Sequence, residues 1–286
     1  MQTIPLVDVR AEYEPLIPRL EAAFREVLDG KGFIRGQNYW AFQEEAAAYL
    51  GVKRTIGVAN GTDALVLALE ALGVGSGDEV ICPAFTFYAT AESVVRRGAT
   101  PVFADIDPVT LNLDVEDTAA RVTDRTRAII SVHLFGRMMD VRPLVELGVP
   151  VLEDAAQAFG APEVAQHGAI STFSFYPTKN LFCLGDLVEI PQDEPGHVYH
   201  LFVCRSRERD AIRAALTEAG IASATYYTTP LHLQPSLHFL GYEAGSLPAT
   251  EQTGVENFSL PLWPGIPAEA QERVVDVVRS AVPSRV

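Results

Sequence analysis

Three short segments carry side chains whose types and spacing could do chemistry together. In the first, Gly61 and Thr62 stand between a short strand candidate and an alanine- and leucine-rich helix candidate. Glycine lets a ligand approach the backbone, Thr62 can cap the helix, and the free N–H groups of a helix start favour a phosphate. An ordinary capped turn between strand and helix explains the same pair without a ligand.

The second segment, residues 151–157, is an apolar strand candidate that runs into two acids. Asp154 falls at the carboxyl end of this strand, where ligands gather in parallel sheets. A buried carboxylate there could keep a heteroaromatic ring nitrogen protonated, which makes a pyridine ring an electron sink. The alternative interpretation is an aspartate that caps the following helix.

The third segment, residues 172–180, is an aromatic strand candidate followed by a proline turn and Lys179. A lysine beneath apolar walls loses its proton more easily and becomes a nucleophile. Ser174, five residues earlier, could donate a hydrogen bond to a phosphate. A surface turn with an exposed lysine fits this segment equally well.

Taken together, the segments supply a phosphate cup, an acid for a ring nitrogen and a nucleophilic amine. These are the separate needs of one cofactor, pyridoxal 5'-phosphate (PLP). They also follow the chain order expected of fold-type I PLP enzymes. We therefore predict a PLP site in which Lys179 is the Schiff-base lysine.

Helix and strand candidates alternate along the first two thirds of the chain. The spacing of apolar residues predicts helices at 12–29, 39–50, 64–72 and 89–97, and strands at 54–59, 79–82, 101–104, 127–132 and 149–152. This alternation predicts an α/β three-layer sandwich with a mixed, mainly parallel sheet covered on both faces.

The last third has a different pattern, which predicts a smaller α+β domain. The pattern predicts a connection at 188–195, a strand at 197–204 and a helix at 207–219. An ordered loop at 226–240 and a closing helix at 268–282 follow. We therefore predict a PLP-binding large domain over 1–187 and a small C-terminal domain over 188–286.

Composition excludes some classes of partner. The formal net charge is -15, and an acidic chain repels nucleic acid and anionic membranes. No apolar run reaches membrane-spanning length, and the first residues lack the pattern of a signal peptide. Cys82, Cys183 and Cys204 form no CxxC pair, which suits a reducing compartment. We expect a cytoplasmic protein without a metal site, in which the cysteines are small buried side chains.

The sequence resembles the DegT/DnrJ/StrS family of sugar aminotransferases over nearly its whole length. The segment around Lys179 is the most specific part of the resemblance. The matching stretches are residues 5–8, 57–65, 77–80, 83–87, 132–136, 153–157, 173–181, 230–232 and 260–262.

The resemblance implies a role for each matching side chain. Gly61, Thr62 and Ser174 would hold the phosphate; Phe87 would stack on the ring; Asp154 would pair with its nitrogen; Gln157 would lie near its hydroxyl; Lys179 would bind the cofactor covalently and move protons; and Tyr226 and His232 would approach substrate from the small domain. A core phenylalanine is the alternative interpretation of Phe87, and an ordered loop that packs on the core explains Tyr226 and His232 about equally well. We interpret His133 as a structural residue.

The implied activity is transfer of an amino group from glutamate or glutamine to a nucleotide-linked ketosugar by a homodimer. This is a reaction of deoxyamino sugar biosynthesis. Some relatives instead use the scaffold for sugar dehydration, with PLP or pyridoxamine phosphate. Those typically replace the lysine with histidine, so Lys179 argues against that chemistry.

One departure from the family pattern follows Asp186. Several dozen residues are absent, and the resemblance resumes near residue 197. In the family this stretch includes an interdomain helix and an asparagine that reaches the neighbouring subunit's phosphate. Either the whole protein carries the segment and this sequence omits it, or the segment is truly deleted. A true deletion would favour a PLP-binding relative that is non-catalytic or regulatory.

Overall fold

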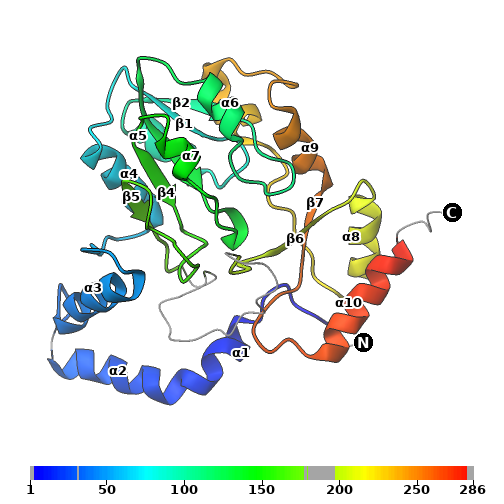
Figure 1. Cartoon of the computed structure of the whole chain (residues 1–286). Helices are drawn as coiled ribbons and strands as arrows, with labels where there is room; N and C mark the ends of the chain where they lie inside the picture. The colour runs from blue at the N-terminus through cyan, green and yellow to red at the C-terminus, as the bar shows by residue number, and fades with distance from the viewer. Residues whose placement is uncertain (1–2, 31, 177–178, 180–196, 282–286) are drawn as a thin grey trace.

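The main sheet of the protein has parallel strands throughout. The computed structural model describes residues 3–30, 32–176, 179 and 197–281, and within them the sheet has the order β2-β1-β3-β4-β5 (Figure 1). Its strands are β1 (Glu79–Pro83), β2 (Thr100–Ala104), β3 (Thr126–Val132), β4 (Val151–Asp154) and β5 (Ile170–Thr172). The predicted α/β fold with a mainly parallel sheet is confirmed.

Helices cover both faces of this sheet, and the alternation of β1 shows how. Val80 and Cys82 pack in one apolar cluster with α4 (Gly61–Ala71) and α5 (Ala89–Arg96). Ile81, between them, packs in a second cluster that includes Leu144 of α7 (Arg142–Val145) and is flanked by α6 (Val115–Ala120). Successive strand residues point to opposite faces, so a strand buried on both sides must be apolar throughout. The result is the predicted three-layer arrangement.

A second, smaller sheet pairs β6 (Phe202–Arg205) with β7 (Asn257–Leu260) in antiparallel register. Its core is formed with α8 (Arg209–Glu218) and α10 (Ala268–Ala281). Ile4 belongs to this core too, since its N–H donates to the carbonyl of Gly220 and it bridges Ile221. The N-terminal residues therefore lie against the C-terminal part of the chain. The domain limits 1–187 and 188–286 stay a proposal.

The chain between the two strands of the small sheet returns to the main sheet. It forms η3 (Leu231–Leu233), η4 (Pro235–Leu240) and α9 (Pro248–Glu256). The N–H of Leu231 donates to the carbonyl of Ala84, and the Asp105 carboxylate accepts from the N–H groups of Ala249 and Thr250 at the start of α9. The predicted ordered loop at 226–240 is thus fixed at the end of β1.

The N-terminal helices form an arm beside this body, seen below the sheet in Figure 1. The arm consists of α1 (Val9–Tyr13), η1 (Glu14–Leu16), α2 (Ile17–Gly30) and α3 (Gln37–Leu50). The single helix predicted at 12–29 is interrupted by the 3-10 turn at Pro15, because proline lacks an N–H and suits only a first helical turn. As predicted, α3 ends at Gly51, whose φ of 67° is left-handed.

The strand predicted at 54–59 is wrong, because its backbone bonds to α3 instead of to a neighbouring strand. The N–H of Gly57 donates to the side chain of Gln43 at 2.7 Å, and its carbonyl accepts from the Tyr39 hydroxyl at 2.9 Å. A Cβ on residue 57 would lie 2.6 Å from the Tyr39 ring, so this approach requires glycine.

Other limits move by a few residues. The aromatic segment 173–176 lies beyond β5, β4 starts at Val151 instead of residue 149, and β6 starts at Phe202 instead of residue 197. Cys82 is buried as predicted and Cys204 is half-buried. Cys183 and the connection predicted at 188–195 lie outside the described residues. Within the described chain, no helix has the length and apolar character needed to cross a membrane.

Candidate active site

The candidate site lies where the strand order of the main sheet reverses. From β1 the chain moves to β2 on one side and then to β3 on the other. Ligands bind beyond the carboxyl ends of parallel strands at such a point. Phe87 follows the end of β1, Asp154 ends β4, and Ser174 lies two residues after β5. The topology therefore brings three of the predicted side chains to one edge of the sheet.

The predicted phosphate turn is assembled around the start of α4. Asn60 caps this helix, because its side chain accepts from the N–H of Asp63 at 2.9 Å, so the predicted capping role of Thr62 is wrong. Gly61 and Thr62 occupy the first two helical positions, whose N–H groups have no acceptor within the helix. A Cβ on residue 61 would lie 3.1 Å from Cβ of Ser174. Glycine thus lets Ser174 approach two N–H groups that favour an anion.

Asp154 is a buried acid with defined hydrogen bonds. Its side chain is only 6% exposed, its Oδ1 accepts from the N–H of Ala156 at 3.2 Å, and its Oδ2 accepts from the Thr90 hydroxyl at 3.3 Å. Burial raises the pKa of Asp154, while these hydrogen bonds and the charge of Lys179 oppose that rise. The predicted helix-capping alternative is wrong, because turns and no helix follow β4 at residues 155–169, and Oδ1 of Asp154 instead accepts within the turn at Ala156.

Lys179 interacts electrostatically with Asp154. Burial lowers the pKa of Lys179, and the attraction of Asp154 opposes that shift. The half-buried His200 interacts electrostatically with the same amine: its pKa falls to about 3, because of desolvation and then the charge of Lys179. A lowered pKa makes the neutral, nucleophilic amine easier to form, and the half-buried position disfavours the surface alternative for Lys179.

Gln157 links the turn after β4 to the loop at residue 226. Its Oε1 accepts from the N–H of Phe135 at 2.7 Å, which leaves its amide N–H groups to donate to the Tyr227 hydroxyl. Burial raises the pKa of Tyr227, and this donation opposes the rise. Tyr227 also contacts Phe87, with ring centroids 6.4 Å apart. Phe87 itself is 58% exposed, so it is not the core phenylalanine of the alternative interpretation.

The two predicted substrate residues differ in environment. Tyr226 is half-buried, and its N–H donates to the side chain of Asn257 at 2.9 Å. His232 is fully covered, and its Nε2 lies 3.0 Å from the Glu251 carboxylate, to which it donates. Within the described residues its buried Nδ1 has no hydrogen-bond partner. The structure therefore does not bring His232 to an open surface.

His133 acts structurally, in agreement with the sequence interpretation. Its Nδ1 accepts from the N–H of Met139 at 3.1 Å, so the ring proton is on Nε2, which donates to Glu153 at 2.9 Å. Although burial acts to raise the pKa of Glu153, the hydrogen bonds from His133 and from two backbone N–H groups lower it overall.

Sequence reasoning missed four side chains of this site: Thr86, Thr90, His200 and Tyr227. Each of them is buried or half-buried and reaches the site from another element. Thr86 and Thr90 are four residues apart, one just before and one at the start of the helix predicted at 89–97, a spacing that can bring both hydroxyls to the same turn. That spacing is the one signal in the sequence that could have revealed them.

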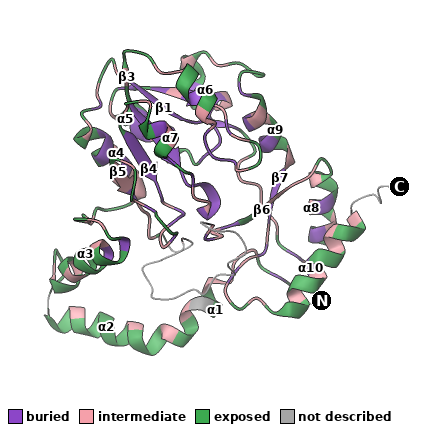
Figure 2. Ribbon diagram, in the orientation of Figure 1, coloured by how far each residue is buried: buried purple, intermediate pink, exposed green. Residues whose placement is uncertain are grey.

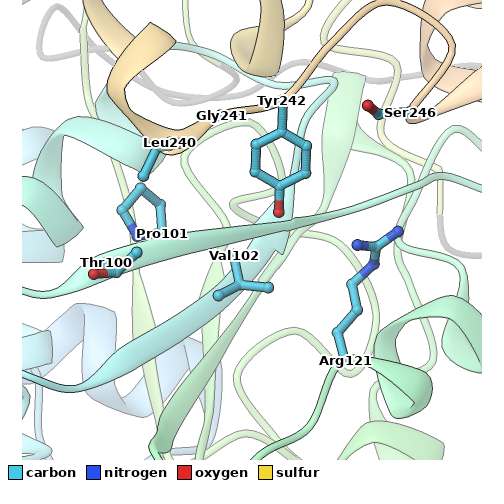
Figure 3. Close-up of a pocket in the computed structure, with 8 residues that line it drawn as sticks. All are labelled: Thr100, Pro101, Val102, Arg121, Leu240, Gly241, Tyr242 and Ser246. Atoms are coloured by element: carbon cyan, nitrogen blue, oxygen red, sulfur yellow. The ribbon is translucent and has the colours of Figure 1, made fainter.

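An open cavity in the described part of the chain lies away from the candidate site. It has a volume of about 500 Å³ and lies on the outer edge of β2, where Tyr242 and Arg121 flank Val102 (Figure 3). The Tyr242 hydroxyl bonds to the backbone of Phe103 there, which closes part of the open sheet edge. None of the candidate site residues lines this cavity.

The residues of the candidate site fit PLP. The glycine cradle at Gly61 and Ser174 suits its phosphate, the exposed face of Phe87 its ring, Asp154 its ring nitrogen and Lys179 its aldehyde. A three-layer α/β fold with these groups at the carboxyl ends of its strands defines a PLP-dependent transferase.

Comparison with known proteins gives the family. The sequence profile of the DegT/DnrJ/EryC1/StrS aminotransferase family matches residues 17–187 and 185–279. The chain belongs to this family of PLP-dependent sugar aminotransferases.

Relatives and solved structures agree over almost the full chain. A "pleiotropic regulatory protein" of Geobacillus stearothermophilus is 36% identical over 96% of this chain and 97% of its own. A UDP-N-acetyl-3-dehydro-alpha-D-glucosamine 3-aminotransferase of Acidithiobacillus ferrooxidans is 34% identical with the same coverage. The crystal structure of S. venezuelae DesV, in complex with a ketimine intermediate, covers 100% of both chains at 31% identity with a TM-score of 0.91.

The comparisons also locate the internal gap. The alignments with the two relatives span 362 and 360 positions, more than the 286 residues of this chain. Since both alignments use 96% of this chain, part of each relative has no counterpart here. The two stretches that match the family profile meet at residues 185–187, which agrees with the break predicted after Asp186.

Proposed function

We propose that this protein transfers an amino group from glutamate or glutamine to the keto carbon of a nucleotide-linked sugar. The observation that carries the proposal is the buried carboxylate of Asp154, which is electrostatically coupled to the half-buried Lys179 and lies at the same sheet edge as the close approach of Gly61 and Ser174. If Asp154 and Lys179 only stabilised the fold, they would need neither a phosphate site nor an exposed aromatic ring near them.

Each side chain has a defined task in this reaction. Bound PLP supplies an electron sink for the negative charge that develops on the carbon next to the transferred nitrogen. Lys179 attaches the cofactor and, as a neutral amine, takes and returns the proton at that carbon in both half-reactions. Asp154 holds the ring nitrogen protonated, and Gln157 lies near the ring hydroxyl. Gly61, Thr62 and Ser174 hold the phosphate, while Phe87 covers one ring face.

For the acceptor, the first candidate to test is a UDP-linked 3-ketosugar. The relative from Acidithiobacillus ferrooxidans is named for such a substrate, and it matches nearly the whole chain. Tyr226 and His232 stay our candidates for contacts to the sugar. The Nδ1 of His232, which has no hydrogen-bond partner among the described residues, supports a contact to a polar group of the sugar.

We further propose that two copies of the chain form a homodimer through the N-terminal arm. The helix α2 has no buried residue, as Figure 2 shows. Large apolar side chains on the arm are open to solvent, among them Phe24 at 67%, Trp40 at 50% and Tyr49 at 67% exposed. Such a surface marks a protein contact. Light scattering tests this proposal, since a monomer at micromolar concentration would contradict it. A cytoplasmic location stays a prediction.

A regulatory function is the second candidate. The name of the Geobacillus stearothermophilus relative supports it, and so does the internal gap, because the protein could bind PLP and lack turnover. A dehydratase is disfavoured because Lys179 is present.

Two measurements distinguish these candidates. Reconstitution with PLP should give absorption of visible light. With glutamate as donor, mass spectrometry should show that the UDP-linked 3-ketosugar is converted to a product with an amino group in place of its keto oxygen. Binding without any turnover would favour the regulatory function. The mass of the natural protein is the accompanying control, because a value well above 31.1 kDa would mean that it carries the missing segment.

A further inference from the structure

Two buried threonine hydroxyls form a chain that ends on Asp154. The Oγ1 atoms of Thr86 and Thr90 lie 3.3 Å apart, and Oγ1 of Thr90 lies 3.3 Å from Oδ2 of Asp154. Thr86 is 2% exposed and Thr90 is fully buried, so water does not compete for these contacts. Thr90 stands in the first turn of α5, where its carbonyl accepts from the Ser93 hydroxyl at 2.8 Å.

The direction of the hydrogen bonds follows from the chemistry of the groups. An ionised carboxylate only accepts, so the single proton of the Thr90 hydroxyl points to Asp154. The Thr90 oxygen is then free to accept, and the Thr86 hydroxyl donates to it. Both bonds run toward the carboxylate. Such a chain favours the charged form of the acid, and each bond polarises the next.

The hydrogen bonds to Asp154 also determine which lone pairs of its carboxylate remain available. The N–H of Ala156 takes one site on Oδ1, and Thr90 takes one site on Oδ2. Each carboxylate oxygen keeps a further acceptor site. Two donors on different oxygens fix the carboxylate plane, so the remaining sites have a defined direction.

We propose that Thr90, supported by Thr86, is a positioning residue that keeps Asp154 ionised and aimed at the ring nitrogen of PLP. This proposal rests on the proposed function, because it concerns the same cofactor. Without the Thr90 hydroxyl, the Asp154 carboxylate binds a proton more tightly. The proton on the ring nitrogen is then drawn toward Asp154. The electron sink then weakens although every residue that touches the cofactor is still present.

The test compares Thr90→Val, which keeps the shape and removes the hydroxyl, with Thr90→Ser, which keeps the hydroxyl. Thr118→Val is the matched control, because Thr118 on α6 is also fully buried, but its hydroxyl donates to the carbonyl of Asp114, the residue that caps this helix. Each protein is reconstituted with PLP labelled with ¹⁵N in the ring, and the ¹⁵N chemical shift reports whether the ring nitrogen is protonated. Thr86→Val replaces Thr90→Val if the latter does not fold, with a smaller shift expected in the same direction.

We expect a protonated ring nitrogen in the wild type, Thr90→Ser and Thr118→Val, and an unprotonated fraction in Thr90→Val. Amino transfer by Thr90→Val should fall at least about tenfold, with recovery in Thr90→Ser. A fully protonated ring in Thr90→Val, or in Thr86→Val if that variant replaces it, would overturn the proposal. If the wild type binds no PLP, the proposed function fails and the test ends at that earlier step, so the two failures are distinguishable.

Discussion

Glu153 and Asp154 are neighbours at the end of β4, yet their carboxylates serve opposite sides of the sheet. Glu153 accepts from His133 at 2.9 Å and from the N–H of Gly168 at 2.6 Å, which ties the turn at 163–168 to the strand. Asp154 accepts from Thr90 of α5 on the other side. Consecutive strand residues point in opposite directions, so one acid is structural and the other is available for chemistry.

Replacement of Asp154 by asparagine should separate binding from catalysis. Asp154→Asn keeps the size of the side chain and removes its charge, so the variant should still attach PLP to Lys179. Amino transfer should fall about a hundredfold or more, because the ring nitrogen is no longer held protonated. Steady-state kinetics with borohydride trapping checks both statements. Transfer at the wild-type rate would show that Asp154 does not serve the ring.

Glu153→Gln should instead lower stability. It leaves His133 without its charged acceptor in a fully buried site, which costs about 2–4 kcal/mol in the free energy of unfolding. Thermal unfolding at pH 7 measures the loss. Any turnover that remains at low temperature should show an unchanged KM. A variant as stable as the wild type would contradict the structural role of Glu153.

The same pair predicts a dependence of stability on pH. The folded state lowers the pKa of Glu153, so its contribution is complete above the unfolded value of about 4.3 and is lost as the pH falls through the folded value. The difference in melting temperature between wild type and Glu153→Gln should therefore be constant from pH 6 to 7 and shrink in acid. A difference that grows on acidification would have the wrong sign for this explanation.

Gly61→Ala should weaken cofactor binding with little effect on the fold. The new Cβ would lie 3.1 Å from Cβ of Ser174 and would push that side chain out of the phosphate cradle. The Kd for PLP, followed by fluorescence quenching, should rise about tenfold. Gly75→Ala is the matched control, because a Cβ there meets no atom within 4 Å. Equal affinities in the two variants would remove Gly61 from the phosphate site.

Much of the fold can be predicted from sequence because strands such as β1, buried on both faces, are short apolar runs. The segment at 54–59 looks similar, but side chains of α3 take its backbone hydrogen bonds. Local patterns do not contain such long-range competition. For the same reason Asp154 and Lys179 were predicted from their own segments, whereas Thr90 was not, since its partner is 64 residues away. The N-cap at Asn60 was missed because Thr62, two residues later, is also a residue type that caps helices.

Covalent trapping on Lys179 tests the central claim most directly. The reconstituted protein is reduced with borohydride, digested and analysed by mass spectrometry, with Lys179→Ala and the exposed-site variant Lys53→Ala alongside. We predict one pyridoxyl group per chain, on Lys179, in the wild type and in Lys53→Ala, and none in Lys179→Ala. A pyridoxyl group that is still trapped at wild-type yield in Lys179→Ala would contradict the assignment of this lysine.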